Sequence, residues 1–201
     1  IEGHTKTVTY NGKEQTVEGY EITSNPANAT VTLVGKAVAS GTDANTYPMG
    51  LTAADFTATS PNYKNVTIEV TDGWLKIDPI ADKVTVTVTE NSAAVTYDGT
   101  EHSVTGYKSM TADNALYDVK KNVAETPTEA WTAKGKYVGT YHVGIKASDF
   151  KNTSGNFTNV EFVIVDGALT ITTDDTEVVV TVTGNTKTVV YDGTEHSVEG
   201  Y

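Results

Sequence analysis

The chain lacks cysteine and arginine, has only two Trp and four Phe among its 201 residues, and contains no long apolar run. Without Cys there is no disulfide, thiolate metal site or cysteine nucleophile. The chain has 14 Lys and 26 acidic residues, which give it a formal net charge of −12. Nucleic acid and anionic membranes both require basic patches, so we expect neither as a partner. We find no signal peptide and no apolar run long enough for membrane insertion in this segment.

Threonine and valine dominate the composition instead, with 36 and 26 residues. Both are β-branched, and β-branched side chains favour pleated, half-buried surfaces. "VTVTVT" at Val84–Thr89 alternates strictly, which is typical of a strand with one buried face. The composition therefore predicts a mainly β fold.

A ten-residue motif occurs three times in the chain. "VTYDGTEHSV" at Val95–Val104 returns as "VVYDGTEHSV" at Val189–Val198, and a variant, "VTYNGKEQTV", stands at Val8–Val17. The tyrosines of the three copies are 87 and then 94 residues apart. Such self-similarity is the signature of a tandem array of modules.

Two further blocks recur at the spacing of 94 residues. Tyr47–Asp78 aligns with Tyr141–Thr172, and Lys83–Asn91 aligns with Glu177–Asn185. The alignment predicts a first repeat over residues 1–81 with a truncated opening strand, a complete second repeat over 82–175, and the opening hairpin of a third over 176–201. We expect this last hairpin to fray, to dock on the preceding repeat or to pair with another chain, because an isolated hairpin is marginally stable.

The Asp-Gly pairs predict two hairpins in each repeat. Asx-Gly suits a two-residue type I′ turn, which would place Val95 opposite His102 and point Glu101 to the other face. A second hairpin is expected to turn at Asp72-Gly73 and again at Asp166-Gly167. About seven short strands per repeat favour an Ig-like β-sandwich, with a β-grasp-like sheet as the alternative.

Several segments lie between these hairpins. Gly139–Phe150 is expected to be a strand that ends in a short turn or a single helical turn. Ala112–Glu125 has some helical spacing, but its counterpart Ala27–Val38 has the pattern of a strand, so we expect both to be mainly strand.

These motifs resemble the tandem MBG- or YDG-type repeats of large bacterial cell-surface, adhesin-like proteins. The resemblance rests on "VTYDGTEHSVTGY", "GTYHVGIKASDF" and "NVEFVIVDGALTIT" and covers nearly the whole chain. It implies a long extracellular array anchored to the cell outside this segment, and it names no ligand. The first copy departs from the pattern at Asn11 and Gln15.

No residue pattern indicates chemistry, so we assign no catalytic, cofactor-binding or metal-binding residue and expect no cofactor and no enzyme activity. The motif histidine is replaced by Gln15 in the first copy, which favours a structural role for His102. We interpret Trp74 and Trp131 as packing residues rather than as a sugar platform. The acidic joints between repeats could supply oxygen ligands for Ca²⁺, but we interpret them as solvated linkers (Asp78, Asp82, Asp174, Asp175 and Glu177).

Two functions from different classes fit this pattern. The first is a stalk or spacer, whose partners are the neighbouring repeats of the same chain. The second is a multivalent adhesin repeat that binds host glycan or protein through its variable middle, Tyr20–Thr46 or Tyr107–Thr140. We also expect head-to-tail self-association, because the unpaired edges of the first and third repeats complement each other.

Overall fold

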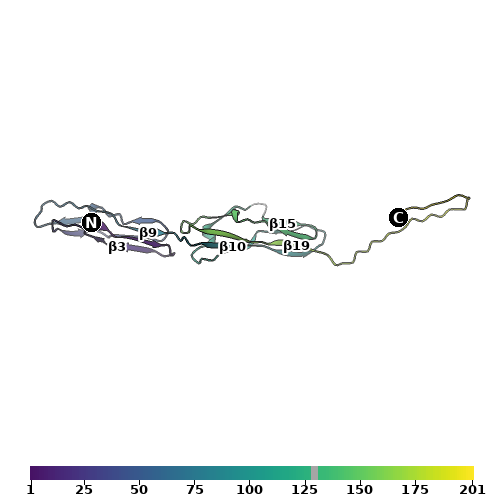
Figure 1. The fold of residues 1–201 in the computed structure, drawn as a ribbon, viewed down its shortest axis with the longest axis horizontal. Helices are drawn as coiled ribbons and strands as arrows, with labels where there is room; N and C mark the ends of the chain where they lie inside the picture. The colour runs from purple at the N-terminus through teal and green to yellow at the C-terminus, as the bar shows by residue number, and fades with distance from the viewer. Residues whose placement is uncertain (128–130) are drawn as a thin grey trace.

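The computed structural model describes residues 1–127 and 131–201 and confirms the mainly β fold, with 41% of residues in strands and 5% in helices. Two groups of strands follow one another along the long axis of the molecule, and the C-terminal segment extends beyond them (Figure 1). We call residues 1–81 the N-terminal unit, 82–172 the central unit and 173–201 the tail. The repeat boundaries themselves stay a prediction.

The N-terminal unit contains short strands and one 3-10 turn. They are β1 (Glu2–Gly3), β2 (Thr5–Thr9), β3 (Gln15–Glu18), β4 (Tyr20–Glu21), β5 (Thr30–Leu33), β6 (Val38–Gly41), β7 (Thr46–Pro48), η1 (Ala53–Asp55), β8 (Phe56–Thr59) and β9 (Trp74–Asp78).

The central unit has the same kind of composition, with one short α-helix added. Its elements are β10 (Val84–Glu90), β11 (Ala93–Thr96), β12 (His102–Thr105), β13 (Tyr107–Ala112), α1 (Val119–Asn122), β14 (Val123–Glu125), β15 (Thr132–Gly135), β16 (Gly139–His142), η2 (Ala147–Asp149), β17 (Phe150–Asn152), β18 (Val160–Val165) and β19 (Ala168–Thr172).

The opening and closing strands of the central unit run parallel along their whole length. β10 lies between antiparallel β13 and parallel β18, with Val84 beside Val160. β11 continues the same line beside β19, with Ala93 beside Leu169. The difference in residue number between paired positions of the opening and closing strands is therefore the same before and after Asp166-Gly167. The expected hairpin at Asp166-Gly167 is wrong, because the chain passes straight through this pair.

The N-terminal unit repeats this parallel arrangement. β2 runs beside β9, with Thr5 next to Trp74. A parallel bridge between Glu2 and Thr71 keeps the same offset upstream. The expected hairpin at Asp72-Gly73 is therefore also wrong.

The hairpin expected at Asp98-Gly99 is wrong in its strand pairing as well. β11 pairs with β19, whereas β12 pairs with β15. The strands on either side of Asp98-Gly99 therefore belong to different sheets. Val95 and His102 are not paired across a ladder, as a hairpin would require. Gly99 has a φ of +77° but Asp98 has no positive φ, and a type I′ turn needs both. The pair is a turn that carries the chain from one sheet to another.

The core of the central unit is enclosed by several small sheets rather than by one continuous sheet. Val88 of β10, Ala133 of β15, Phe150 of β17 and Leu169 of β19 belong to one buried cluster. Complete burial of a valine such as Val88 contributes roughly 1.5–3 kcal/mol. Alternation of Val and Thr in β10 thus places every Val on the buried face, as the sequence pattern predicts.

The segments between these strands match the sequence predictions in part. Gly139–Phe150 forms β16 followed by the 3-10 turn η2, as expected. Ala112–Glu125 was expected to be mainly strand, but it contains the helix α1. Asp118 caps this helix by accepting a hydrogen bond from the backbone N–H of Lys120, a local interaction that favours helix initiation.

The tail makes no strand and does not dock on the central unit (Figure 1). Two hydrogen bonds close a loop within it: the Asn185 backbone N–H donates to Gly200 O at 3.3 Å, and Asn185 Nδ2 donates to Glu199 O at 2.9 Å. Asn91 makes the equivalent two bonds in the central unit, to Gly106 O and Thr105 O. The tail therefore closes the same loop as the matching motif of the central unit, although it forms no strand.

Candidate functional site

The Asp98-Gly99 turn holds the most concentrated set of polar side chains in the central copy of the motif. Asp98 Oδ1 accepts hydrogen bonds from the Thr100 backbone N–H at 2.8 Å and from Thr100 Oγ1 at 2.7 Å. Nε2 of His102 lies 3.0 Å from the same oxygen. Because an ionised carboxylate only accepts hydrogen bonds, the imidazole is the donor.

This geometry makes Asp98 a weak base. The hydroxyl of Thr100, then its backbone N–H, then His102 stabilise the ionised carboxylate, so the pKa of Asp98 lies well below its usual value. A group that releases its proton so readily is poorly suited to accept one near neutral pH. We therefore interpret the cluster as a device that fixes the turn.

The other two copies of the motif support a local, structural interpretation. In the tail, Asp192 Oδ1 accepts from the Thr194 N–H at 3.0 Å and lies 2.9 Å from His196 Nε2. In the N-terminal unit, Asn11 Oδ1 accepts from the Lys13 N–H at 2.9 Å. The turn thus forms in the exposed tail and also where Asn replaces Asp, so it requires neither tertiary packing nor the histidine.

The two tryptophans were predicted to be packing residues, and Trp131 is one. It is 7% exposed, stacks on Phe150 with ring centroids 5.5 Å apart, and donates from Nε1 to Asp149 Oδ2 at 2.8 Å. Together with the backbone N–H of Lys146, this bond holds the pKa of Asp149 below its ordinary value. Trp74 is half-buried in β9.

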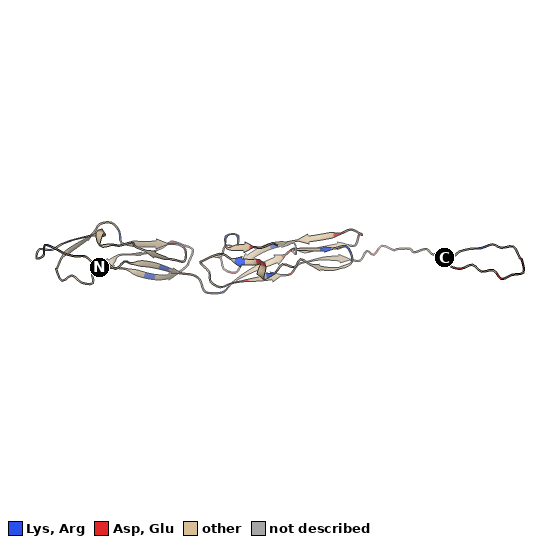
Figure 2. Cartoon of the chain, turned by 90° about the horizontal axis from the view of Figure 1, so that it is seen from above, with Lys and Arg blue, Asp and Glu red and all other residues tan. Residues whose placement is uncertain are grey.

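The acidic joints do not gather into a metal site among residues 1–127 and 131–201, where no group of three potential His, Cys, Asp or Glu ligands occurs. Asp78 pairs with Lys76 at 2.9 Å, and Asp174 accepts from Thr176 Oγ1 at 2.6 Å. Lys and acidic residues are spread along the strands of both units (Figure 2). Among the same described residues, no helix has the length and hydrophobicity of a membrane-spanning segment.

The contact between the two units is built from specific interactions, and we call it the joint. The interpretation of the Asp78–Asp82 segment as a solvated linker is therefore wrong, because Ile80 within it is bonded to the central unit. Ile80 forms a parallel bridge with Phe157; its N–H donates to Asn156 O at 2.9 Å, and its carbonyl accepts from the Thr158 N–H at 3.1 Å. The ring of Tyr10 packs edge-on against Phe157, with centroids 5.7 Å apart. Phe157 is only 2% exposed and lies in a buried cluster of the central unit with Val84, Val86 and Tyr117, so Tyr10 and Ile80 pack against the core of that unit.

Asn156 closes the joint on its other side. Its Oδ1 accepts from the Ala44 N–H at 2.6 Å, and its Nδ2 donates to Asp43 Oδ1 at 2.9 Å. Tyr10 also packs against the core of the N-terminal unit around Leu75 and Ile77. One side chain therefore connects the cores of both units, a contact between residues too distant in sequence to be predicted from it.

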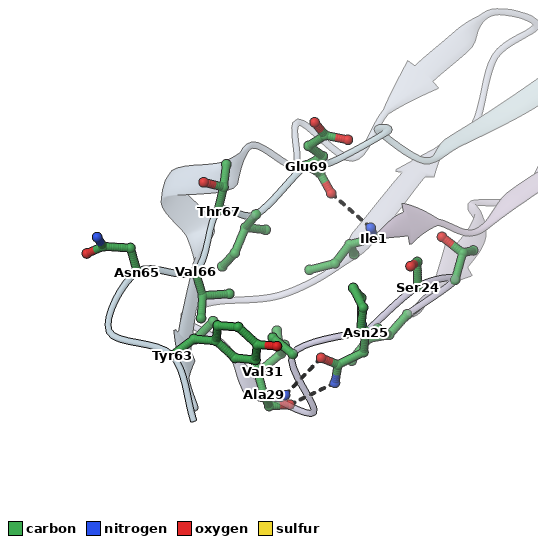
Figure 3. Close-up of a pocket in the computed structure, with 16 residues that line it drawn as sticks. Ile1, Ser24, Asn25, Ala29, Val31, Tyr63, Asn65, Val66, Thr67 and Glu69 are labelled. Carbon is green, nitrogen blue, oxygen red and sulfur yellow. Dashed lines mark hydrogen bonds between the residues drawn. The ribbon is translucent and has the colours of Figure 1, made fainter. Parts of the chain in front are cut away.

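A groove opens in the N-terminal unit, with a cavity volume of about 390 Å³ (Figure 3). One wall is the segment Ile22–Ala29, and the other is Asn65–Glu69. Val31 contributes to its lining, and Ile1 stands at one end, where its terminal ammonium donates to Glu69 O at 2.8 Å. No sequence pattern predicts this groove, because its walls lie about 40 residues apart and, among the described residues, neither wall belongs to a strand.

Comparison of the chain with protein-family models and with curated proteins gave no match.

Proposed function

We propose that the chain consists of non-catalytic spacer repeats in the stalk of a large extracellular bacterial surface protein. Two considerations support this function: the resemblance of its motifs to MBG- or YDG-type repeats, and the joint. A spacer must keep the parts that it separates at a fixed distance. A joint with a buried aromatic residue and several hydrogen bonds resists bending better than a solvated linker does.

The joint carries the proposal because it couples units that have separate cores. Apart from the bridge between Ile80 and Phe157, no strand in the described residues of one unit pairs with a strand of the other. Each unit is thus a separate set of sheets, and the orientation between them depends on Tyr10, Asn156 and Phe157. The partners in this function are the neighbouring repeats of the same chain.

Spin-label distance measurements test the mechanical part of this proposal. The chain has no Cys, so the pair Thr57→Cys and Lys134→Cys gives one label in each unit at exposed strand positions. We expect a narrow distance distribution in the otherwise unchanged protein and a broad one after Asn156→Ala. A broad distribution before that substitution would mean that the units are flexibly tethered, which a spacer of fixed length excludes.

Cell-surface location needs a separate test. Antibodies raised against Ile1–Tyr201 should label intact cells of the source bacterium without permeabilisation. Labelling that requires permeabilised cells would refute the extracellular assignment.

A second candidate function is a low-affinity, multivalent adhesin that binds host glycan or protein. The observation that favours it is that Ile22–Ala29, one wall of the groove, belongs to the variable segment Tyr20–Thr46. The corresponding segment of the central unit, Tyr107–Thr140, differs in that it contains the helix α1. A glycan and mucin screen on the whole chain, repeated after Tyr63→Ala in the groove, distinguishes the two functions, because a spacer gives no signal that depends on Tyr63.

A further inference from the structure

The chain enters and leaves the central unit through strands that are bonded to each other. β10 runs parallel to β18, and β11 runs parallel to β19. Val84 lies beside Val160 where the chain enters, and Thr96 lies beside Thr172 where it leaves. The N-terminal unit and the tail accordingly adjoin opposite ends of the central unit (Figure 1). We call these four strands together the parallel ladder.

Hydrogen bonds close the parallel ladder at both of its ends. The Val84 backbone N–H donates to Asn159 O at 2.9 Å at the entry end, and the Tyr97 backbone N–H donates to Thr172 O at 2.9 Å at the exit end. The pairing thus extends to the residues at which the chain passes to its neighbours.

Side chains bridge the gap between the two halves of the parallel ladder. The Gly167 backbone N–H donates to Glu90 Oε2 at 2.6 Å, and the Ala168 backbone N–H donates to Ser92 Oγ at 3.3 Å. Both acceptors belong to the opening side and both donors to the closing side. The opening and closing strands are therefore connected along their full length, the gap included.

Tension along the chain would pull the two sides of the parallel ladder past each other. Tension on the residues before Val84 draws the opening strands toward the N-terminal unit, and tension on the residues after Thr172 draws the closing strands toward the tail. Interstrand hydrogen bonds run across the strands, so this sliding loads them together rather than one after another. The strands between β11 and β18 in the sequence carry no tension until the parallel ladder slips.

We propose that the parallel ladder is a mechanical clamp that lets the central unit withstand tension applied along the chain. The resistance to force follows from the order and direction of the strands alone, whereas its use in a stalk rests on the proposed spacer function. β2 runs parallel to β9 in the N-terminal unit, so the same arrangement occurs in both units.

Single-molecule force spectroscopy on the full chain tests the clamp through the choice of pulling points. The chain has no Cys, so Asp82→Cys with Thr173→Cys places exposed handles just outside the two ends of the parallel ladder. Asp82→Cys with Asn159→Cys is the matched control, because both handles then lie at the entry end and the force separates the bonds in succession. We expect the first pair to require about twofold higher unfolding force or more at the same loading rate. Equal forces in the two geometries overturn the proposal.

A pair of core variants separates the clamp from overall stability. Val88 and Val143 are both completely buried in the same cluster, but Val88 lies in the parallel ladder beside Ile164 and Val143 lies outside it. Val88→Ala and Val143→Ala remove the same atoms, so both should lower stability to urea. With handles at positions 82 and 173, we expect Val88→Ala to lower the unfolding force more than Val143→Ala does. An equal decrease would mean that the force reports overall stability, which overturns the clamp.

The spin-label distances between positions 57 and 134 distinguish failure of the clamp from failure of the spacer. Equal unfolding forces in the two pulling geometries, together with a narrow distance distribution, overturn the clamp and leave the spacer intact. A higher force between positions 82 and 173, together with a broad distance distribution, supports the clamp and refutes a spacer of fixed length.

Discussion

The side chain of Glu90 accepts a hydrogen bond of 2.6 Å through Oε2 from the backbone N–H of Gly167, and its Oε1 accepts one of 2.7 Å from the Ile145 N–H. Glu90 is 2% exposed. It joins the opening strand to the point where the closing strand passes from β18 to β19. Only glycine fits at position 167, because a Cβ there would lie 2.2 Å from Asn91 O.

The N-terminal unit satisfies the equivalent backbone N–H with a different carboxylate. Leu51 stands where Ile145 does in the repeat, and its N–H donates to Asp72 Oδ1 at 2.8 Å, while the Gly50 N–H donates to Oδ2 at 3.0 Å. The position of Glu90 is Gly3 in that unit. In both units a carboxylate accepts a hydrogen bond from this backbone N–H. The carboxylate belongs to the opening strand in the central unit and to the closing segment in the N-terminal unit.

The first prediction concerns this carboxylate. Glu90→Gln replaces an acceptor oxygen with an NH₂ group, so one buried N–H loses its partner, and the central unit should lose about 1–3 kcal/mol of unfolding free energy. Urea denaturation followed by circular dichroism measures it. Asp166→Asn is the control, since Asp166 is exposed and is the counterpart of Asp72. Equal stability of Glu90→Gln and Asp166→Asn would contradict the assignment.

A second prediction tests the turn glycine. Gly99→Val should destabilise the central unit by about 1–3 kcal/mol, because φ is +77° and a β-branched residue is strained there. A Cβ at Gly99 would meet no atom within 4 Å, so the cost comes from the backbone alone. Gly155→Val is the matched control: its surroundings are equally open and its φ is not positive. Similar denaturation midpoints for the two variants would argue against a strained turn.

His102 should be replaceable. We expect His102→Gln to change the unfolding free energy by no more than about 0.5 kcal/mol, the range of an ordinary surface substitution. Gln15 already occupies this position in the N-terminal unit, where its Nε2 donates to Thr9 O at 3.1 Å. Thermal denaturation of the variant and the parent provides the comparison. A large loss of stability would show that the contact between His102 and Asp98 does more than orient the turn.

The fourth prediction concerns pH. The folded-state pKa of Asp98 is lowered, chiefly by the Thr100 hydroxyl. A lowered folded-state pKa means that the ionised contact stabilises the turn above the ordinary Asp pKa and is lost as pH falls through the lowered one. Thr100→Val should raise the Asp98 pKa toward its usual value, measured by the carboxyl carbon chemical shift in NMR.

The tail supplies an internal comparison for that titration. The pKa of Asp192 is also lowered, chiefly by the Thr194 hydroxyl. Thr194→Val should therefore raise the Asp192 pKa and leave that of Asp98 unchanged. If neither aspartate responds to loss of its threonine hydroxyl, the turn is held by other interactions.

The polar motif was recognisable in the sequence, but its geometry was not. The motif recurs three times, and Gln15 in the first copy already indicates that the turn does not require the histidine. A type I′ hairpin would have placed His102 beside Val95, whereas the folded chain places it against Asp98. Neither the joint nor the groove could be predicted from the sequence. Tyr10 contacts Phe157, which is 147 positions away, and such a contact produces no periodic pattern in the sequence.

The β-strands of this protein follow from the amino-acid sequence, because alternating Val and Thr bury one face whichever strand lies beside them. The local turns follow from it as well, because Asp or Asn can accept a hydrogen bond from the N–H two residues later wherever the motif stands. The pairing of the strands, in contrast, depends on the folded chain as a whole. Asp98-Gly99 turns the chain, but Asp166-Gly167 lets it run straight, because there β18 and β19 both remain bonded to the opening strand and Gly167 approaches Asn91 and Glu90 too closely for any side chain.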